Sequence, residues 1–364
     1  MERTRIGVVG CGNISSIYLA NLNQRFETVK VEAVSELIPE RAIRQSEKFG
    51  VARILSTDEL LHDPQVDIVL NITTPKDHAE ICRQALQAGK SVYVEKPLSV
   101  RLEDGRSLNA LAASKNLLLG GAPDTFMGAG IQTCIDLIQS GAIGRPIGAT
   151  AFMTCHGHES WHPDPEFYYQ VGAGPMFDMG PYYLTALFSL LGPARRVTGS
   201  TQVSFQERTI TSAGKYGQKI KVDVPTHVAG IIDFTCGAIG TILTSFDVWS
   251  AELPRIEIYG SLGTLSVPDP NTFGGPVRLR LAGQDAFETI AVTRPYAENS
   301  RGLGVADMAR AQREGRRDHR ASGELTLHVL EAMHGFHLAS DSGCHYTMQS
   351  TLATPAAVDP ACRY

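Results

Sequence analysis

The hydrophobic and polar positions follow one pattern up to about Gly120 and another pattern after it. In the first part, short apolar runs predict strands at residues 5–9, 29–35, 66–72, 92–94 and 117–120. The intervening stretches have helical spacing, at residues 14–23, 39–49, 77–88 and 102–115. Short strands that alternate with helices are typical of a parallel, doubly wound sheet. We therefore predict an α/β domain over residues 1–122.

The second part is rich in strand signals. Helices are predicted at residues 127–139, 178–191 and 324–340, and strands at 147–155, 228–234, 238–246, 255–259, 264–267, 277–281 and 287–292. Gly237 and the Gly260-Ser-Leu-Gly263 segment predict hairpins. We expect an α+β domain over residues 123–350, with a large, open, mostly antiparallel sheet. The Ala- and Pro-rich residues 351–364 are expected to form a loose tail.

Composition narrows the class of protein. The chain has 364 residues, 43% of them hydrophobic, and a net charge of -5 without a basic block. This argues against nucleic acid or an anionic membrane as a partner. The seven cysteines are scattered and form no C-x-x-C pair, which argues against a disulfide framework or a zinc site. No segment is typical of a signal peptide or a membrane span, and a reducing cytoplasm fits best.

The loop after the first strand predicts a dinucleotide site. It reads Gly10-Cys11-Gly12-Asn13-Ile14-Ser15 between a strand and a helix. Such glycines allow a tight turn and close approach to a pyrophosphate, which then meets the helix N-terminus. Ser15 replaces the third glycine of the usual motif. The alternative is a tight strand-to-helix turn without a ligand.

An acid near the end of the second strand would bind the ribose hydroxyls. Glu36 lies at the end of this strand, whereas the competing Glu32 lies within it. A carboxylate repels a 2′-phosphate, and Leu37 and Ile38 offer no positive charge. We therefore expect NAD rather than NADP, unless Glu36 is only an exposed carboxylate at a strand end.

Two further strand ends carry candidate residues. Thr73, Thr74 and Pro75 follow the third strand and His78 begins the next helix, although an ordinary capped turn would look the same. The fourth strand ends in Glu95-Lys96-Pro97. Ligands of such sheets bind at the carboxyl ends of strands, which makes Lys96 a candidate functional residue. The alternative is a solvated lysine at a strand end, followed by a turn proline.

In the second domain, a glycine-rich segment leads into a predicted helix at Asp178. Asp178 and Tyr182 are spaced i, i+4 and would share one helix face, and both can move protons. The alternative is that Asp178 only caps the helix.

The preceding loop combines histidines, aromatic rings and acids. Such a surface suits a sugar, which presents apolar C–H patches and hydroxyls together. A metal site is not expected, because no convincing set of ligands accompanies the histidines. The candidate substrate-binding residues outside the Asp178 helix are Asp124, His158, Trp161, His162, Tyr168 and His227.

These motifs resemble, in order, those of the glucose–fructose oxidoreductase / inositol dehydrogenase / rhizopine-catabolism (Gfo/Idh/MocA) family. The resemblance extends to about Met348. It rests on the Gly10 loop, Thr73-Thr74-Pro75 with His78, residues 88–98 with Glu95-Lys96-Pro97, residues 138–144, and the approach to Asp178-x-Gly180.

The resemblance implies a Rossmann domain followed by an α/β domain whose open sheet often forms an oligomer interface, here a homodimer or homotetramer. It implies that Lys96 contacts the reacting hydroxyl and the cofactor, next to a Lys96–Pro97 bond that is often cis. The implied cofactor contacts are Gly10, Gly12, Asn13, Ile14, Glu36, Thr73, Thr74, Pro75, His78, Glu95 and Lys96.

The chain departs from the family at the residue that many members use as a catalytic histidine. Tyr182 stands there, and Thr185 replaces an acid. Some members carry tyrosine at that position, so the replacement does not by itself abolish activity, but it argues against inositol dehydrogenase chemistry. A phenol has a pKa near 10 and needs a neighbouring cation such as Lys96 to act as a base.

We therefore expect an oxidoreductase that transfers hydride between the nicotinamide of NAD and a ring carbon of a sugar, sugar derivative or polyol. Lys96, Asp178 and Tyr182 would be catalytic, and the substrate would lie between the domains. The alternatives are an NAD-dependent enzyme that cleaves glycosides through transient oxidation and a non-catalytic sensor of sugar or NAD.

Overall fold

The computed structural model describes residues 3–364, which divide into two compact units. Unit 1 contains the chain up to Gly128, together with Pro295–Leu327 and Pro355–Tyr364. Unit 2 contains Ala129–Arg294 and His328–Thr354. This division differs from the expected single boundary near residue 122, because two later segments return to unit 1.

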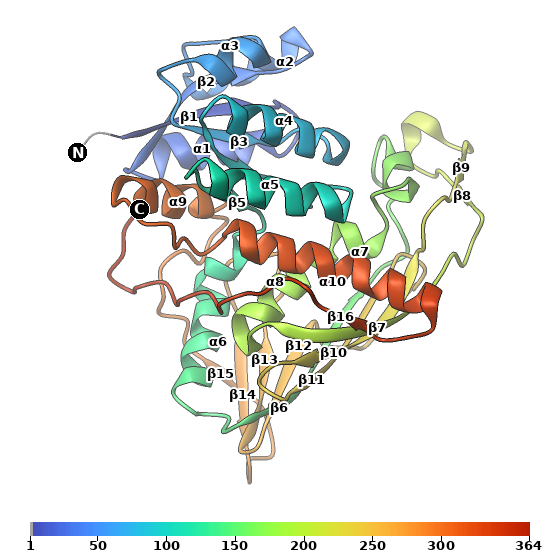
Figure 1. The fold of residues 1–364 in the computed structure, drawn as a ribbon. Coiled ribbons are helices and arrows are strands. Elements are labelled where there is room, and N and C mark those ends of the chain that lie inside the picture. Colours follow the sequence, from blue (N-terminus) through green and yellow to red (C-terminus); the bar gives the residue numbers. More distant parts are fainter. Residues whose placement is uncertain (1–2) are drawn as a thin grey trace. The chain divides into compact units, whose positions relative to one another are not determined.

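Unit 1 is built on a five-stranded parallel sheet (Figure 1). Its strand order is β2-β1-β3-β4-β5, which confirms the predicted doubly wound fold. The order reverses between β1 and β3, and ligands of such sheets bind outside the carboxyl ends of strands at this point. The strands are β1 (Thr4–Val9), β2 (Val29–Ser35), β3 (Ile68–Asn71), β4 (Ser91–Val94) and β5 (Leu119–Gly121).

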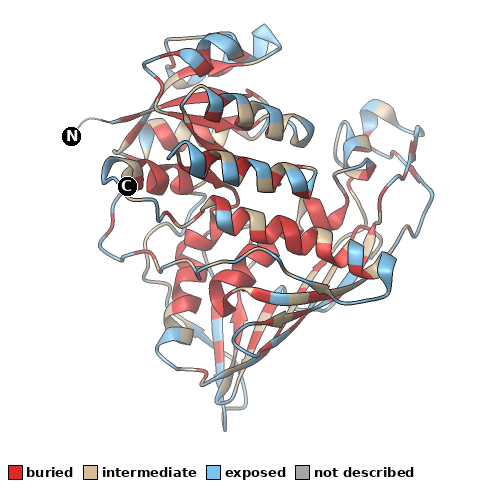
Figure 2. Cartoon of the chain, in the orientation of Figure 1, coloured by how far each residue is buried: buried red, intermediate tan, exposed pale blue. Residues whose placement is uncertain are grey.

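The helices of unit 1 connect these strands. β3 and β4 are buried along their whole length (Figure 2), as expected for the centre of a covered parallel sheet. The helices that lie wholly in unit 1 are α1 (Ser15–Gln24), α2 (Pro39–Phe49), α3 (Thr57–His62), α4 (Pro75–Gln87), α5 (Leu102–Ser114) and α9 (Leu303–Arg313). A 3-10 turn, η1 (Thr125–Met127), follows β5.

Helix α9 was not predicted. It begins after Gly302, which has no side chain to cap the helix. The cap comes from Asp124, whose Oδ2 accepts hydrogen bonds from the N–H groups of Gly302 and Gly304 at 2.9 Å each. A capping carboxylate accepts hydrogen bonds from backbone N–H groups that have no partner within the helix. This contact therefore fixes the start of α9.

The predicted loose tail is wrong. In the last ten residues, Val358, Cys362 and Tyr364 are buried. The Tyr364 hydroxyl donates to Asp307 Oδ1 at 2.8 Å, and Arg320 Nη1 also donates to this oxygen, at 2.6 Å. Apolar burial and this buried hydrogen-bonded group therefore hold the tail on unit 1.

Unit 2 contains a nine-stranded sheet with the order β15-β14-β13-β12-β6-β11-β10-β7-β16. All its pairs are antiparallel except β6 with β11, which confirms the predicted open sheet. The strands are β6 (Pro146–Thr154), β7 (Ala194–Gln202), β10 (His227–Phe234), β11 (Ile239–Ser245), β12 (Ile256–Gly260), β13 (Gly263–Val267), β14 (Val277–Leu281), β15 (Glu288–Ile290) and β16 (Tyr346–Thr347).

The two faces of this sheet differ. In β10, Val228 and Ile232 are buried, whereas Ile231 between them is 48% exposed. Helix α8 (Gly180–Leu191), α6 (Ala129–Gln139) and the later part of α10 (Gly323–Ser342) belong to unit 2, and every residue of α8 is buried (Figure 2). Phe336 of α10 packs closely on β7 and β10. Helices therefore cover one face and leave the other open.

The helix expected at residues 178–191 is split. α7 (Pro175–Asp178) ends before Met179, and α8 starts at Gly180. Pro181 has no N–H to donate to Phe177, so the i to i−4 bonding of one continuous helix is broken here. Tyr182 N instead donates to Met179 O at 3.1 Å. We had expected Asp178 and Tyr182 to lie on one continuous helix, and this prediction is wrong.

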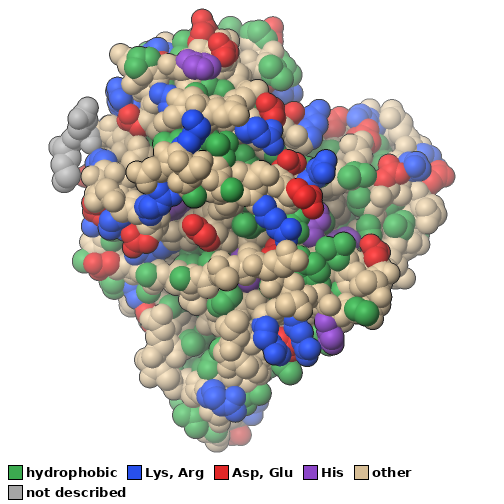
Figure 3. Space-filling view, viewed as in Figure 1, with side chains coloured by type: hydrophobic (Ala, Val, Ile, Leu, Met, Phe, Trp, Pro, Cys, Tyr) green, Lys and Arg blue, Asp and Glu red, His purple; other side chains and the backbone are tan. Residues whose placement is uncertain are grey.

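A small hairpin projects from unit 2. It consists of β8 (Glu207–Thr209) and β9 (Lys219–Lys221), which are antiparallel and form a separate two-stranded sheet. The turn η3 (Ala213–Lys215) lies between them, and η2 (Pro165–Tyr169) lies in the loop after β6. In Figure 3, positive and negative side chains are interspersed on the visible face. No helix among residues 3–364 is both long and apolar enough to cross a membrane.

Candidate active site

The glycine loop lies between β1 and α1. Gly10 has φ +106°, and a Cβ there would lie 2.7 Å from the carbonyl oxygen of Ile72, so only glycine fits. A Cβ on Gly12, in contrast, would have no neighbour within 4 Å. At the start of α1, Ile14 provides no side-chain cap. The space at Gly12 and the uncapped helix N-terminus fit the pyrophosphate of a dinucleotide.

Glu36 lies beside this loop. Its Oε2 accepts a hydrogen bond from Cys11 N at 2.7 Å, and its Oε1 accepts one from Ile38 N at 3.1 Å. The carboxylate is thus held at the end of β2, where a ribose would present its hydroxyls. Burial is the main cause that raises the pKa of the Cys11 thiol to about 11, and the charge of Glu36 adds to this shift. The thiol therefore stays neutral.

The loop after β3 is fixed from within. Asn71 Oδ1 accepts from Thr73 Oγ1 at 2.7 Å, and Thr74 Oγ1 donates to Asp77 Oδ2 at 2.5 Å. The ring of His78 is buried and lies 2.7 Å from Pro97 O and 3.2 Å from Thr73 O. Burial is the main cause that lowers the pKa of His78, so the neutral ring donates to one of these carbonyls.

His78 therefore holds two loops together rather than facing solvent. Pro75 begins α4, and exposed Asn13 lies in the glycine loop. Together with Thr73 and Thr74, these residues follow the ends of β1 and β3, the two strands between which the strand order reverses.

The end of β4 carries Glu95 and Lys96. Glu95 is 9% exposed, and its Oε1 accepts from the Tyr18 hydroxyl at 2.8 Å. Its Oε2 accepts from the backbone N–H of Lys96 at 2.9 Å. Lys96 is half-buried, and the Lys96–Pro97 bond is cis, as the family resemblance implied. Tyr18 was not predicted to take part, and no local sequence signal marks it.

Asp124 has a different surrounding from the one we expected. It is 1% exposed, and its carboxylate caps α9. Burial raises its pKa to about 6, although the N–H groups of Gly304 and Gly302 oppose the shift. The structure thus gives Asp124 a supporting contact in unit 1, whereas we had expected substrate binding.

Several candidate residues of unit 2 lie around His158. Its Nε2 lies 3.7 Å from Asp178 Oδ2. Its ring stacks on Tyr168 with a centroid separation of 3.8 Å, and Phe246 meets it edge-on at 4.6 Å. Trp161 is 62% exposed, and its ring lies 5.4 Å from that of His158. An imidazole and a carboxylate thus meet inside an aromatic wall.

The remaining unit 2 candidates are His162, His227 and Tyr182. His162 packs edge-on against Tyr168 at 5.3 Å, and its Nδ1 accepts from Asp164 N at 3.0 Å. His227 begins β10, and its Nδ1 lies 2.9 Å from Ser245 Oγ. Tyr182 is buried in the first turn of α8. Among residues 3–364, no group of three or more His, Cys, Asp or Glu side chains could hold a metal ion.

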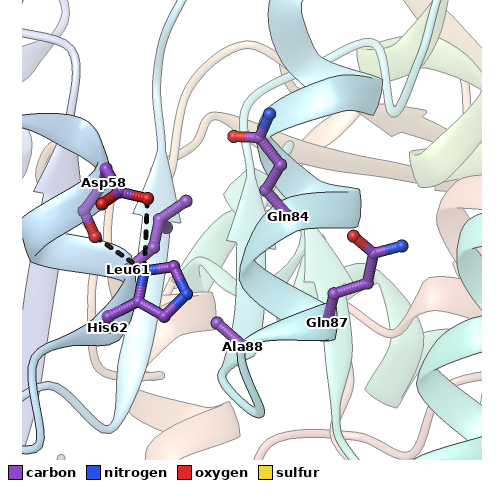
Figure 4. A pocket seen from close by; sticks show the side chains of 6 residues that line it. All are labelled: Asp58, Leu61, His62, Gln84, Gln87 and Ala88. Atoms are coloured by element: carbon purple, nitrogen blue, oxygen red, sulfur yellow. Dashed lines mark hydrogen bonds and ion pairs between the residues drawn. The ribbon is translucent and has the colours of Figure 1, made fainter.

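A separate pocket lies on unit 1 beside α3 and α4 (Figure 4). His62 and Asp58 approach each other there, with Nδ1 and Oδ1 3.3 Å apart, and both side chains are exposed. It shares no residue with the predicted site. The lining residues are Asp58, Leu61, His62, Gln84, Gln87 and Ala88.

Comparison with curated proteins identifies relatives along most of the chain. Myo-inositol 2-dehydrogenase of Thermotoga maritima is 29% identical over 264 residues, which cover 72% of this chain and 74% of that protein. 1,5-Anhydro-D-fructose reductase of Ensifer adhaerens is 29% identical over 268 residues, with coverage of 72% and 74%. dTDP-3,4-didehydro-2,6-dideoxy-alpha-D-glucose 3-reductase of Streptomyces antibioticus is 29% identical over 339 residues, with coverage of 91% and 93%.

Solved structures share the fold. Levoglucosan dehydrogenase in complex with NADH superposes with a TM-score of 0.81 at 20% identity, covering 96% of this chain and 100% of that chain. An NAD binding oxidoreductase from Klebsiella pneumoniae gives a TM-score of 0.77 at 21% identity, covering 95% and 98%.

Family models account for both domains. The model of the oxidoreductase family with an NAD-binding Rossmann fold matches residues 4–121, which include the glycine loop and Lys96. The model of the GFO/IDH/MocA C-terminal domain matches residues 131–266, which include His158 and Asp178. Since these matches cover most of the chain, it belongs to the GFO/IDH/MocA family of NAD-binding oxidoreductases.

Proposed function

We propose that this NAD-dependent oxidoreductase acts on a ring carbon of a sugar, sugar derivative or polyol. The observation that carries the proposal is the approach of His158 to Asp178 within an aromatic wall, at 3.7 Å. Aromatic faces suit the C–H patches of a sugar ring, and the imidazole and carboxylate suit its hydroxyls. The named activities of the relatives, on inositol, anhydrofructose and dideoxyglucose derivatives, support this substrate class.

In the oxidation direction, the ring carbon loses a hydride and its hydroxyl loses a proton. NAD bound in unit 1 supplies the hydride acceptor. We assign Lys96 to bind the reacting oxygen and Tyr182 to exchange its proton, while Asp178 orients the substrate or shares the role of base. We assign His158, whose Nε2 lies 3.7 Å from Asp178 Oδ2, to hydrogen-bond a hydroxyl of the substrate. In reduction, a neutral Tyr182 donates its proton to the forming alkoxide.

The residues that we assign to NAD binding all lie in unit 1. Gly10, Gly12, Asn13 and Ile14 would surround the pyrophosphate, and Glu36 would bind the ribose. Thr73, Thr74, Pro75, Glu95 and Lys96 would line the nicotinamide side of the site, with His78 behind them. The carboxylate of Glu36 favours NAD over NADP.

The test is a panel of sugars and polyols assayed for NADH formation, and of their keto forms assayed for NADH consumption. We expect the wild type to turn over at least one ring substrate. In Lys96→Ala the rate of turnover should fall by orders of magnitude, while NADH binding persists. A surface variant, Lys115→Ala, is the control. Cleavage of aryl glycosides without net NADH formation would instead favour the glycoside-cleaving alternative. NADH binding with no turnover of any kind would favour a sensor.

We also propose that the protein forms a homo-oligomer through the open face of the large sheet. Ile231 and Ile239 are 48% and 57% exposed on neighbouring strands of this sheet. Sedimentation of the wild type and of Ile231→Lys tests this, because a charge in an apolar interface should dissociate it.

The seven cysteines are all free thiols, which supports our proposal of a reducing, cytoplasmic location.

A further inference from the structure

Arg208 of β8 is a buried cation beside the proposed substrate surface. Its side chain is only 6% exposed, and those of its two partners Glu159 and Asp247 are 8% and 7% exposed. Its Nε donates to Glu159 Oε1, and its Nη1 donates to Asp247 Oδ1 at 3.1 Å. Its Nη2 donates to the carbonyl oxygen of Phe246 at 2.8 Å. All three nitrogens of the guanidinium are therefore used.

These partners are the immediate neighbours of the residues that enclose the candidate site. Glu159 follows His158 directly, and Asp247 follows Phe246. His158 and Phe246 meet edge-on, with ring centroids 4.6 Å apart. Through one planar group, Arg208 thus joins the loop after β6 to the end of β11.

The hairpin that carries Arg208 also holds the same loop by its backbone. The N–H groups of Thr211 and Ser212 donate to Glu159 O at 3.0 and 2.8 Å. Ser212 Oγ donates to His162 O at 2.9 Å. The β8–β9 hairpin therefore contacts the loop on both sides of Trp161, and Arg208 is its only buried charge among the described residues 207–221.

Tyr169 completes the packing around the guanidinium. Its ring lies 5.6 Å from Arg208 Cζ, and it is fully buried. Gly157 has φ +76°, and a Cβ there would come within 2.5 Å of Arg208, Glu159 and Tyr169 side-chain atoms. The loop therefore passes so close to this cluster that only glycine is accommodated.

A buried cation with two carboxylates is a poor source of net stability, because desolvation offsets much of the attraction. It does fix orientation, since the planar guanidinium holds several acceptors at defined angles and a lysine ammonium cannot. The ion pairs of Arg208 thus serve to orient His158 towards Asp178 more than to stabilise the folded protein.

We infer that Arg208 is a positioning residue for the proposed reaction: it holds Glu159 and Phe246 so that His158 is presented to Asp178 and the substrate. This inference rests on the proposed function. We assign Arg208 no direct contact with substrate or cofactor. Its replacement should therefore impair the use of the sugar and leave the binding of the cofactor unchanged.

The test compares Arg208→Lys with Arg196→Lys, which alters the more exposed ion pair between Arg196 and Asp233 in the same unit. We expect Arg208→Lys to lower kcat/KM for the sugar at least tenfold, while the Kd for NADH changes less than twofold. Hydrogen exchange of the backbone amides at residues 158–170 should become at least tenfold faster. Arg196→Lys should leave both readouts unchanged.

Glu159→Gln is the second variant, because it keeps the shape of the side chain if Arg208→Lys does not fold. It should give the same defects to a smaller degree. Unchanged exchange and sugar kinetics in the folded variants would overturn the inference, as would an equal loss of NADH affinity. If the wild type oxidises or reduces no sugar, the proposed function fails, and the exchange measurement alone then decides whether Arg208 orders this loop.

Discussion

The hydroxyl of Tyr18 donates a hydrogen bond to Glu95 Oε1 at 2.8 Å in the interior of unit 1. Tyr18 belongs to the helix after the glycine loop, and Glu95 directly precedes Lys96. The second carboxylate oxygen accepts the Lys96 N–H. One buried side chain therefore links the segment predicted to bind pyrophosphate to the segment that presents the candidate catalytic lysine.

Replacement of Tyr18 by Phe should weaken this link. The variant leaves one oxygen of a buried carboxylate without its donor, which costs about 1–3 kcal/mol. We expect a loss of that size in the free energy of unfolding measured with urea, together with a lower kcat. Tyr216→Phe is the control, because Tyr216 is 76% exposed. Equal stabilities of the two variants would show that the Tyr18 bond is dispensable.

Gly12→Ala should separate cofactor binding from folding. The added methyl group meets nothing within 4 Å in the protein, so stability should be nearly unchanged. It would fill the space proposed for the pyrophosphate, and we expect the Kd for NADH to rise at least tenfold, or about 1.4 kcal/mol. Gly214→Ala is a matched control, since a Cβ there also has no neighbour. Unchanged NADH fluorescence titrations in Gly12→Ala would place the cofactor elsewhere.

Glu36→Ala should reduce the preference for NAD over NADP. The variant removes the charge that repels a 2′-phosphate and the acceptor for ribose hydroxyls. We expect the ratio of kcat/KM values for NAD and NADP to fall at least tenfold. Glu40→Ala, in the first turn of α2, is the control for a lost surface charge. A constant ratio would mean that another residue reads the ribose.

The sequence predicted the elements whose information is local. Apolar runs between helical stretches identified the parallel sheet, and Gly237 and Gly260 identified hairpins. Helix α9 was missed because its cap, Asp124, comes from a distant segment. The same long-range contact explains why Asp124 looked like a substrate residue: the sequence shows a polar residue after a strand but not the N–H groups that it meets.

The candidate site shows the same division. Glu36 and Lys96 could be chosen because each lies within two residues of the end of a strand. The Arg208 cluster could not, since Glu159 and Asp247 are 49 and 39 residues away from Arg208 in the chain. The break between α7 and α8 did have a local signal, Pro181, which the spacing of Asp178 and Tyr182 outweighed in our prediction.

Tyr182→Phe should lower the rate far more than Tyr183→Phe. Both tyrosines are buried in the first turns of α8, so the two changes remove similar groups from similar surroundings. By the family resemblance, Tyr182 and not Tyr183 is expected at the position that many members give to a catalytic histidine. We expect at least a hundredfold loss of kcat in Tyr182→Phe, in line with the usual contribution of general acid–base catalysis. Equal losses in the two variants, measured with the best ring substrate, would remove Tyr182 from the chemistry.

Asp124→Asn should change the dependence of stability on pH. Burial raises the pKa of Asp124 from 3.8 to about 6 in the folded protein, so the folded state binds more protons between these values. Its contribution to stability is therefore fully present below pH 3.8 and is lost as pH rises through about 6. A shift of this size corresponds to about 3 kcal/mol.

Asn keeps an oxygen that can accept from Gly302 and Gly304 but does not titrate. The stability of the wild type relative to Asp124→Asn should therefore fall by up to about 3 kcal/mol between pH 4 and pH 7. Urea unfolding at several pH values measures this difference. Asp285→Asn, at an exposed position, should give a flat difference. A flat difference for Asp124→Asn as well would mean that the carboxyl group has the same pKa in the folded and unfolded chains.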